Sequence, residues 1–267
     1  MTTNSTAFVG SIPENYDRSL GPHIFAGYAA DLAQRVVALT PGSVLELAAG
    51  TGIVTRCLRD ALLPECHLTV TDLNSPMLEV AKAKFQADDA VSFEAADAME
   101  LPYADAKFDV IVCQFGVMFF PDKRRSYREA HRTLKPGGSY LLSIWDSLDV
   151  NTFAQITQDA VATFFPNDPP AFYEVPFGYS DPAVVRSELL SGGFDKVDIE
   201  HLPLRSSIPS ADNFAQGLVF GNPLHAEIVS RGGDPQAVRA AVSTAIDQYL
   251  GSEMSMQALV VHARKDS

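Results

Sequence analysis

The sequence predicts an α/β fold in which a seven-stranded, mostly parallel sheet carries helices on both faces. Short apolar runs alternate with amphipathic runs between Val44 and Trp145, a pattern typical of parallel strands joined by crossover helices. A second observation is the segment Val44–Gly52, where an apolar strand with a single acid runs into a glycine turn that opens a helix. Two further strand-like runs near the C-terminus complete the expected sheet.

The composition is that of a globular protein, and its charge limits the choice of partners. Of 267 residues, 46% are hydrophobic and 20% are charged, and the formal net charge is -13. So negative a chain would repel a phosphate backbone, and no nucleic-acid partner is expected. The three cysteines, Cys57, Cys66 and Cys113, show no metal-ligand spacing and are expected to be thiols in a reducing compartment.

The chain shows no signal for export or membrane insertion. The first residues lack a basic region followed by an apolar run, and no stretch approaches the roughly 20 apolar residues of a membrane span. We therefore expect no membrane span and a cytoplasmic location.

An amphipathic helix is expected before the first strand. Pro22 should start it, since proline is favoured in the first helical turn, and apolar residues recur every four positions from Ile24 to Val36. The helix should end before Thr40. A polar segment ahead of it, residues 13–18, contains Tyr16.

The turn formed by Gly50, Thr51 and Gly52 is expected to lie against a small ligand. Glycine permits a positive φ and removes the Cβ that would keep a ligand away, and the helix that follows offers free N–H groups. A dinucleotide-binding turn would place a third glycine at position 55, where this chain has Thr55. The turn therefore favours a nucleotide-like cofactor without a pyrophosphate.

Acidic residues follow the next two predicted strands. The strand over 66–71 ends at Asp72, about 20 residues past the glycine turn, where a carboxylate can accept hydrogen bonds from both hydroxyls of a ribose. The strand over 90–95 is followed by Asp97, whose carboxylate suits an adenine amino group.

Two more strands complete the central series. A fourth, over 108–113, ends before Gln114, and a fifth, over 139–145, follows a helix stop at 134–138. Ligands of parallel sheets bind at the carboxyl ends of the strands. The residues that should converge there are Glu46, Gly50, Asp72, Asp97 and Gln114.

This ordered set of strands, glycine turn and acids closely resembles the class I S-adenosylmethionine-dependent methyltransferases, in particular the type 11 branch that includes ubiquinone/menaquinone-biosynthesis enzymes. The resemblance implies a Rossmann-like sheet whose last strand is antiparallel, S-adenosylmethionine as cofactor, and S-adenosylhomocysteine as product. It also implies in-line methyl transfer to a small hydrophobic or aromatic acceptor. The residues expected to bind the cofactor are Tyr16, Glu46, Gly50, Thr51, Gly52, Asp72, Leu73, Asp97, Ala98, Gln114 and Phe115.

Beyond Asn151 the sequence predicts a helix over 153–165, a sixth strand over 196–204 and a seventh over 256–264. The segment between these two strands is mostly helical, far longer than a hairpin requires, and aromatic around Phe214, so we expect a substrate cap there. The chain should form one structural unit. Its parts are a lid and helix in 1–42, the cofactor-binding core in 43–148, and the end of the sheet with the cap in 149–267.

Two histidines, His23 in the lid and His225 in the insertion, are candidates for a general base because imidazole titrates near neutrality. No metal is expected, since Gln114 stands where metal-dependent relatives carry an acid. The Asn/Asp-Pro-Pro-aromatic signature of amino-group methyltransferases does not follow the fourth strand. The sequence leaves oxygen, carbon and nitrogen acceptors open, with oxygen or carbon methylation as the working hypothesis.

Two alternatives stay open. One is a nicotinamide-dependent oxidoreductase on a similar sheet, against which Thr55 and Asp97 argue. The other is a non-catalytic S-adenosylmethionine-binding regulator, because methyl transfer needs few obligatory residues. The sequence is compatible with a monomer or a homodimer.

Overall fold

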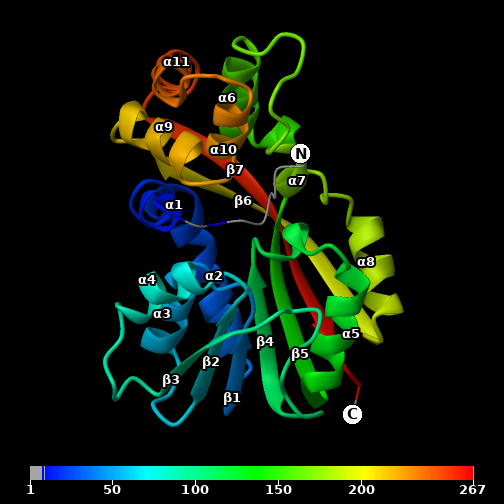
Figure 1. Ribbon diagram of the computed structural model, residues 1–267. Helices are drawn as coiled ribbons and strands as arrows, with labels where there is room; N and C mark the ends of the chain where they lie inside the picture. The colour runs from blue at the N-terminus through cyan, green and yellow to red at the C-terminus, as the bar shows by residue number, and fades with distance from the viewer. Residues whose placement is uncertain (1–7, 9, 267) are drawn as a thin grey trace.

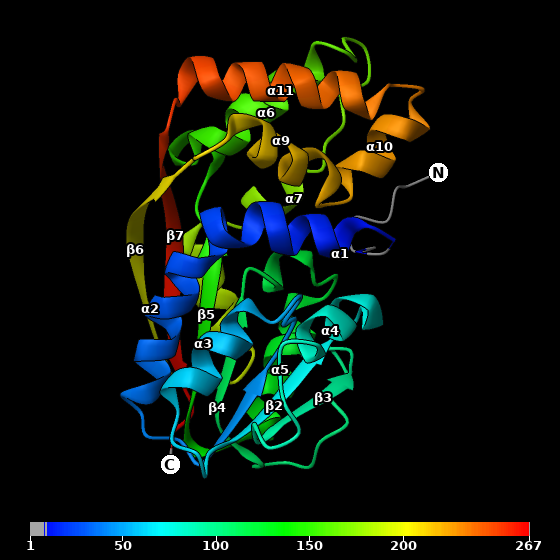
Figure 2. The same cartoon turned by 90° about the vertical axis from the view of Figure 1, so that its left-hand side faces the viewer.

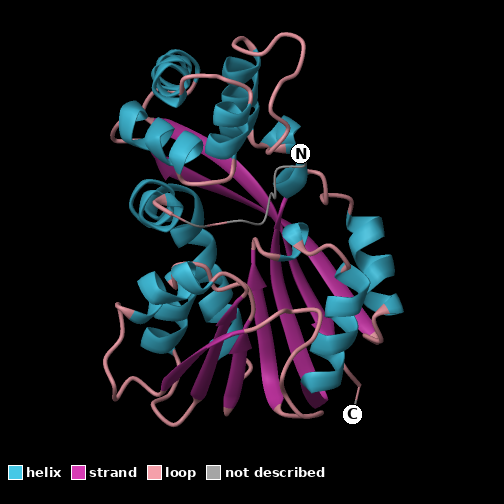
Figure 3. Cartoon of the chain, in the orientation of Figure 1, coloured by secondary structure: helices cyan, strands magenta, loops and turns pink. Residues whose placement is uncertain are grey.

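The structure is a computed structural model that describes Phe8 and residues 10–266. Its centre is a seven-stranded sheet with the strand order β3-β2-β1-β4-β5-β7-β6 (Figures 1 and 3). β1 pairs in parallel with β2 and β4, whereas β7 is antiparallel to both β5 and β6. The predicted fold class, including the antiparallel last strand, is confirmed.

The strands are short on the β3 side of the sheet and long on the β6 side. β1, β2 and β4 are almost completely buried, which explains why they read as continuous apolar runs rather than as alternating ones. Their bounds are β1 (Ser43–Glu46), β2 (His67–Asp72), β3 (Val91–Ala95), β4 (Phe108–Gln114), β5 (Leu134–Trp145), β6 (Lys196–Ser207) and β7 (Glu253–Arg264).

Helices cover both faces of this sheet. In Figure 1, α2, α3 and α4 lie on one side and α5 and α8 on the other. The predicted apolar stripe of α2 is buried, with Tyr28, Leu32 and Val36 each at most 1% exposed. These helices are α2 (Ala26–Val37), α3 (Ile53–Ala61), α4 (Ser75–Lys82), α5 (Lys123–Thr133) and α8 (Pro182–Ser191).

A helical layer, which we call the cap, lies beyond the carboxyl ends of the parallel strands (Figure 2). β6 and β7 run up into it and pair as far as Ser207 with Glu253, so each strand is three residues longer than predicted. Backbone pairing extends β6 there, because Arg205–Ser207 carry no apolar residue that would predict a strand. The cap contains α6 (Thr152–Ala162), α9 (Ala211–Phe220), α10 (Leu224–Ser230) and α11 (Pro235–Tyr249), with α7 (Glu174–Phe177) beneath it.

The first helical segment begins earlier than predicted. α1 (Ile12–Asn15) continues through the π-helical segment η1 (Tyr16–Phe25) into α2. Pro13 lies in the first turn of α1, where its missing N–H costs no hydrogen bond, and Pro22 lies inside η1 instead of starting a helix. In Figure 2 this segment passes between the cap and the sheet.

Two other predicted boundaries were wrong. β5 begins at Leu134, which pairs with Phe108, and regular pairing resumes at Ser139 opposite Val110. The glycine pair at 137–138 is thus an irregularity within a strand rather than the end of a helix. α6 ends at Ala162, three residues before the predicted end at 165.

Candidate active site

The glycine turn after β1 has left-handed backbone at both glycines, with φ of +57° at Gly50 and +81° at Gly52. A Cβ on Gly52 would lie 2.8 Å from the Cβ of Ala81, so this glycine is required for packing against α4. A Cβ on Gly50 would meet only the side chains of Met77 and Tyr16, at 3.6 and 4.0 Å. Gly50 lies on the wall of a cavity, whereas Gly52 holds the turn.

Asp72 at the end of β2 is tied to that turn. Its Oδ2 accepts a hydrogen bond from the Gly50 N–H (2.8 Å), and its Oδ1 accepts one from the Asn74 N–H (2.7 Å). Burial raises the pKa of Asp72 while these backbone donors oppose the shift. A carboxylate has about four acceptor positions, so Asp72 can hold the turn and still accept hydrogen bonds from a ligand in the cavity.

Buried oxygens without partners gather beneath the turn. Four side-chain atoms make no hydrogen bond to any described residue: Glu46 Oε2, Thr51 Oγ1, Thr55 Oγ1 and Gln114 Oε1. Three of these residues, Glu46, Thr51 and Gln114, line a small cavity of about 20 Å³. Burial raises the pKa of Glu46 to about 8. Because unpaired buried acceptors are costly, a bound hydrogen-bond donor would complete this site.

Asp97 and Ala98 follow β3 and line the larger cavity. Asp97 Oδ1 accepts a hydrogen bond from the Met99 N–H (2.8 Å), which closes a tight turn. Leu73, which follows Asp72, is 61% exposed and also lines that cavity. The ends of β2 and β3 thus contribute neighbouring walls, as the sequence predicts.

The larger cavity has a volume of about 190 Å³ and brings most of the predicted residues together. Tyr16 lies over the turn and stacks on Phe25 with 4.7 Å between ring centroids. Glu46 and Thr51 lie on the smaller cavity, and Gly52 lies within the turn. The predicted residues on the larger cavity are Tyr16, Gly50, Asp72, Leu73, Asp97, Ala98, Gln114 and Phe115.

The other end of the cavity is aromatic. Trp145, the last residue of β5, stacks on Phe115 with 4.0 Å between centroids and an interplanar angle of 7°. Trp145 also stacks on Phe177 at 5.7 Å. The sequence prediction missed most of this wall; the one available signal was the position of Trp145 at a strand carboxyl end. The aromatic wall consists of Phe25, Phe115, Phe119, Phe120, Trp145, Phe153, Phe172, Tyr173 and Phe177.

Phe115 has unusual backbone geometry. Its φ is +52°, which for a bulky residue costs on the order of 1–3 kcal/mol. The Phe115 N–H donates to the Ser143 carbonyl (2.8 Å), which holds this conformation. The strain places the Phe115 ring on Trp145, between the polar and aromatic ends of the cavity.

The two candidate bases do not reach the cavity. His23 Nδ1 lies 3.1 Å from the Ser207 carbonyl oxygen, and the ring packs against Phe214. His225 packs against Phe220 at 5.1 Å between centroids. Neither histidine lines either cavity, because η1 turns His23 toward the cap and α10 carries His225 away from the sheet. Sequence position alone does not show whether a helical side chain faces a ligand cavity.

Within residues 10–266 and Phe8, no group of three or more His, Cys, Asp or Glu side chains is arranged to hold a metal ion. No helix in this part of the chain is long and apolar enough to cross a membrane.

Comparison with known proteins agrees with this geometry. Residues 45–142 match the family described as a methyltransferase domain. Over this range the chain resembles a methyltransferase domain in sequence. The matched range runs from the end of β1 through most of β5 and contains the glycine turn, Asp72, Asp97 and Gln114. The resemblance that the glycine turn and the strand-end acids predicted is confirmed.

A relative and two solved structures are similar to the chain. A ubiquinone/menaquinone biosynthesis C-methyltransferase UbiE of Bartonella quintana (strain Toulouse) is 36% identical over 139 residues, which are 49% of this chain and 54% of the relative. The chain thus spans about half the length of the curated relatives it matches. The YcgJ protein of Bacillus subtilis has a TM-score of 0.57 at 18% identity, covering 90% of this chain and 99% of that one.

A phosphoethanolamine N-methyltransferase of Haemonchus contortus, in complex with S-adenosylhomocysteine, has a TM-score of 0.55 at 14% identity. It covers 97% of this chain and 61% of that one. At these identities the two structures report a shared fold. The methyltransferase-domain match rests on the sequence.

Proposed function

We propose that the protein is an S-adenosylmethionine-dependent methyltransferase acting on oxygen or carbon of a small, apolar, aromatic acceptor. One observation carries this proposal. A single cavity joins the glycine turn and the strand-end acids Asp72 and Asp97 to a wall of stacked aromatic rings. Cofactor and acceptor would therefore meet inside one enclosed space.

The residues of the polar end fit the cofactor. Asp72 would bind the ribose hydroxyls and Asp97 the adenine amino group, while Gly50 gives the ligand access to the backbone. The unpaired acceptors of Glu46, Thr51 and Gln114 suit a cationic amino group. When bound, S-adenosylmethionine supplies an electrophilic methyl carbon on its sulfonium sulfur.

The aromatic end limits the chemistry of the acceptor. No described residue that lines the cavity is a lysine, arginine or histidine, so an acceptor with a phosphate or carboxylate would find no countercharge. Flat aromatic walls favour a ring that stacks between them. The Bartonella relative is named a C-methyltransferase of ubiquinone/menaquinone biosynthesis, which favours a ring carbon of a quinone-like acceptor.

The chain's own residues contribute alignment and water exclusion rather than proton transfer. The titratable residues on the cavity are Tyr16, Asp72, Asp97 and Tyr173. Burial raises the pKa of both tyrosines far above neutrality, and the two acids are assigned to the cofactor. The acceptor would therefore enter already ionised, as a phenolate-type anion whose charge faces the sulfonium of the cofactor, and the aromatic wall would orient it for in-line attack.

The test is binding followed by turnover. We expect S-adenosylhomocysteine to raise the melting temperature, since a ligand that binds only the folded state stabilises it. A methyl-transfer screen over phenols, quinols and carboxylic acids, read by mass spectrometry, should give product with the first two classes. A thermal shift with NAD, but none with S-adenosylmethionine or S-adenosylhomocysteine, would favour the oxidoreductase. Binding without turnover on any acceptor would favour a regulator.

A further inference from the structure

The loop between β3 and β4 forms one wall of the cavity but has no helix or strand of its own (residues 96–107). Its first part is a tight turn in which Asp97 accepts hydrogen bonds from two backbone N–H groups, Met99 to Oδ1 (2.8 Å) and Glu100 to the carbonyl (2.9 Å). Something must hold this turn against the sheet for Asp97 to keep its place.

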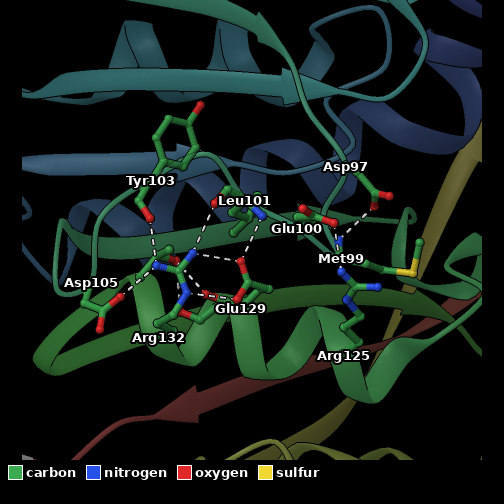
Figure 4. A network of polar contacts seen from close by, with 11 residues as sticks. Asp97, Met99, Glu100, Leu101, Tyr103, Asp105, Arg125, Glu129 and Arg132 are labelled. Carbon is green, nitrogen blue, oxygen red and sulfur yellow. Dashed lines mark hydrogen bonds and ion pairs between the residues drawn. The ribbon is translucent and has the colours of Figure 1, made fainter.

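Arg132, in the last turn of α5, is bonded to this loop at three points (Figure 4). Its Nη1 donates to the Tyr103 carbonyl (2.7 Å) and to Asp105 Oδ1 (2.8 Å), and its Nη2 donates to the Leu101 carbonyl (3.1 Å). The guanidinium is planar with donors in a fixed fork, so it imposes one geometry on all three acceptors.

Glu129, one helical turn earlier, binds both Arg132 and the loop, and we call these two residues the clamp. Both of its oxygens accept from Arg132, Oε1 from Nε (2.9 Å) and Oε2 from Nη2 (2.8 Å). Oε2 also accepts from the Leu101 N–H (2.9 Å). Leu101 is therefore held through both its N–H and its carbonyl, directly after the turn that begins at Asp97. Arg132 lowers the pKa of Glu129, which keeps the pair ionised.

We propose that Arg132, acting with Glu129 on the backbone of Leu101 and Tyr103, is a positioning residue for the adenosine end of the cofactor site. It sets the place of Asp97 without touching the ligand. This inference rests on the proposed function, because it concerns the affinity of the same site for an adenosyl compound.

The geometry separates this role from general stability. The Ala106 N–H donates to the Arg132 carbonyl (3.0 Å), and the Lys107 N–H donates to the Thr133 carbonyl (2.8 Å). These backbone bonds do not involve the Arg132 side chain, so in R132M and R132K we expect the end of the loop to stay on α5 and β4 to keep its start. Loss of the side chain would free the part of the loop that carries Asp97.

The same helix provides a matched control. Arg125 reaches the same loop, but through one exposed ion pair with Glu100 (2.9 Å), in which the two side chains are 50% and 80% exposed. Such pairs contribute little. In contrast, the Arg132 and Glu129 side chains are 32% and 20% exposed and satisfy backbone groups.

The experiment measures Kd by calorimetry for S-adenosylhomocysteine and for adenosine in the wild type, R132M, R132K and R125M. We expect R132M to raise both Kd values by about tenfold, and R132K by roughly threefold, because an ammonium cannot reproduce the fork. R125M should stay within about twofold of the wild type. An equal loss for adenosine and the full ligand places the effect at the adenosine end. Melting temperatures measured in parallel show whether each variant is folded.

Wild-type Kd values in folded R132M, or an equal loss in R125M, would overturn the positioning role while leaving the proposed function intact. If R132M does not fold, R132K decides, and wild-type affinity in that variant overturns the proposal. Failure of the wild type itself to bind S-adenosylhomocysteine would reject the proposed function, and this inference with it.

Discussion

The two ends of the cavity are built in different ways. The polar end uses residues between Gly50 and Gln114, which lie at or just after the carboxyl ends of parallel strands. The aromatic end uses residues from η1, the segment 119–120, β5, α6 and the segment 172–177, which the fold brings together from distant parts of the chain. Directional hydrogen bonds require fixed backbone at the first end, whereas stacked rings at the second end require only shape and apolar surface.

This difference predicts how each end tolerates change. At the polar end, Asp72 accepts hydrogen bonds from the turn and, under the proposed function, from the ligand as well, so a substitution there should affect both. At the aromatic end many rings would contact the acceptor. A substitution there should lower kcat/KM for the acceptor and leave the affinity for the cofactor unchanged.

The largest expected effect is on stability and involves Glu46. Its folded pKa of about 8 exceeds the ordinary value of 4.5, so the folded state binds more protons between these values. The stability contributed by the protonated carboxyl is complete below about pH 4.5 and is lost as pH rises through about 8. E46Q removes this loss and should gain stability over the wild type by up to about 1.4 kcal/mol per pH unit in that window. Urea unfolding at several pH values measures it. If the difference in unfolding free energy between E46Q and the wild type did not change with pH, Glu46 would be ionised in the folded state over the whole range.

The second effect is on cofactor affinity. D72A should weaken binding of S-adenosylhomocysteine by roughly 1.5–3 kcal/mol, because it removes charge-assisted hydrogen bonds and leaves the Gly50 and Asn74 N–H groups without an acceptor. Calorimetry gives the number, and D72N, which keeps the shape, should lose less. D97A should lose affinity as well, by a smaller amount, since Asp97 bonds only its own turn. Unchanged affinity in both alanine variants would contradict the assignment of these acids to ribose and adenine.

The third effect tests the aromatic end. F177A should lower kcat/KM for the acceptor by about tenfold, while the Kd for S-adenosylhomocysteine stays within about twofold, because distant sites contribute nearly independently. F194A is the matched control, since Phe194 is a buried ring stacked on Tyr140 that does not line the cavity. Equal losses of kcat/KM in the two variants would show that packing, rather than acceptor contact, is being measured.

The smallest effect is expected at the histidines. H23Q and H225Q should keep kcat within about twofold of the wild type between pH 6 and 8, because neither ring lines the cavity and each packs against a phenylalanine instead. Steady-state rates across this pH range provide the test. A loss of about 100-fold in either variant would restore that histidine as a general base.

The sequence by itself determined the sheet and the polar end of the site. Parallel strands buried on both faces must be apolar runs, and the φ of a tight strand-to-helix turn demands glycine, so Gly50, Asp72 and Asp97 could be placed from local pattern alone. The order of these elements sufficed because consecutive strands of a parallel sheet end at the same edge.

Only the tertiary structure decided the aromatic wall, the place of the histidines and the clamp formed by Arg132 and Glu129. Apolar residues such as Phe153 and Phe177 look the same in sequence whether they fill a core or line a cavity, since burial depends on contacts between distant segments. Arg132 in a helix reads as an ordinary surface charge, because its acceptors are backbone carbonyls of a loop about 30 residues away and carry no sequence signal. A residue can be predicted from the sequence where local backbone geometry requires it. Contacts between distant segments cannot be predicted in this way, because many residue types can make them.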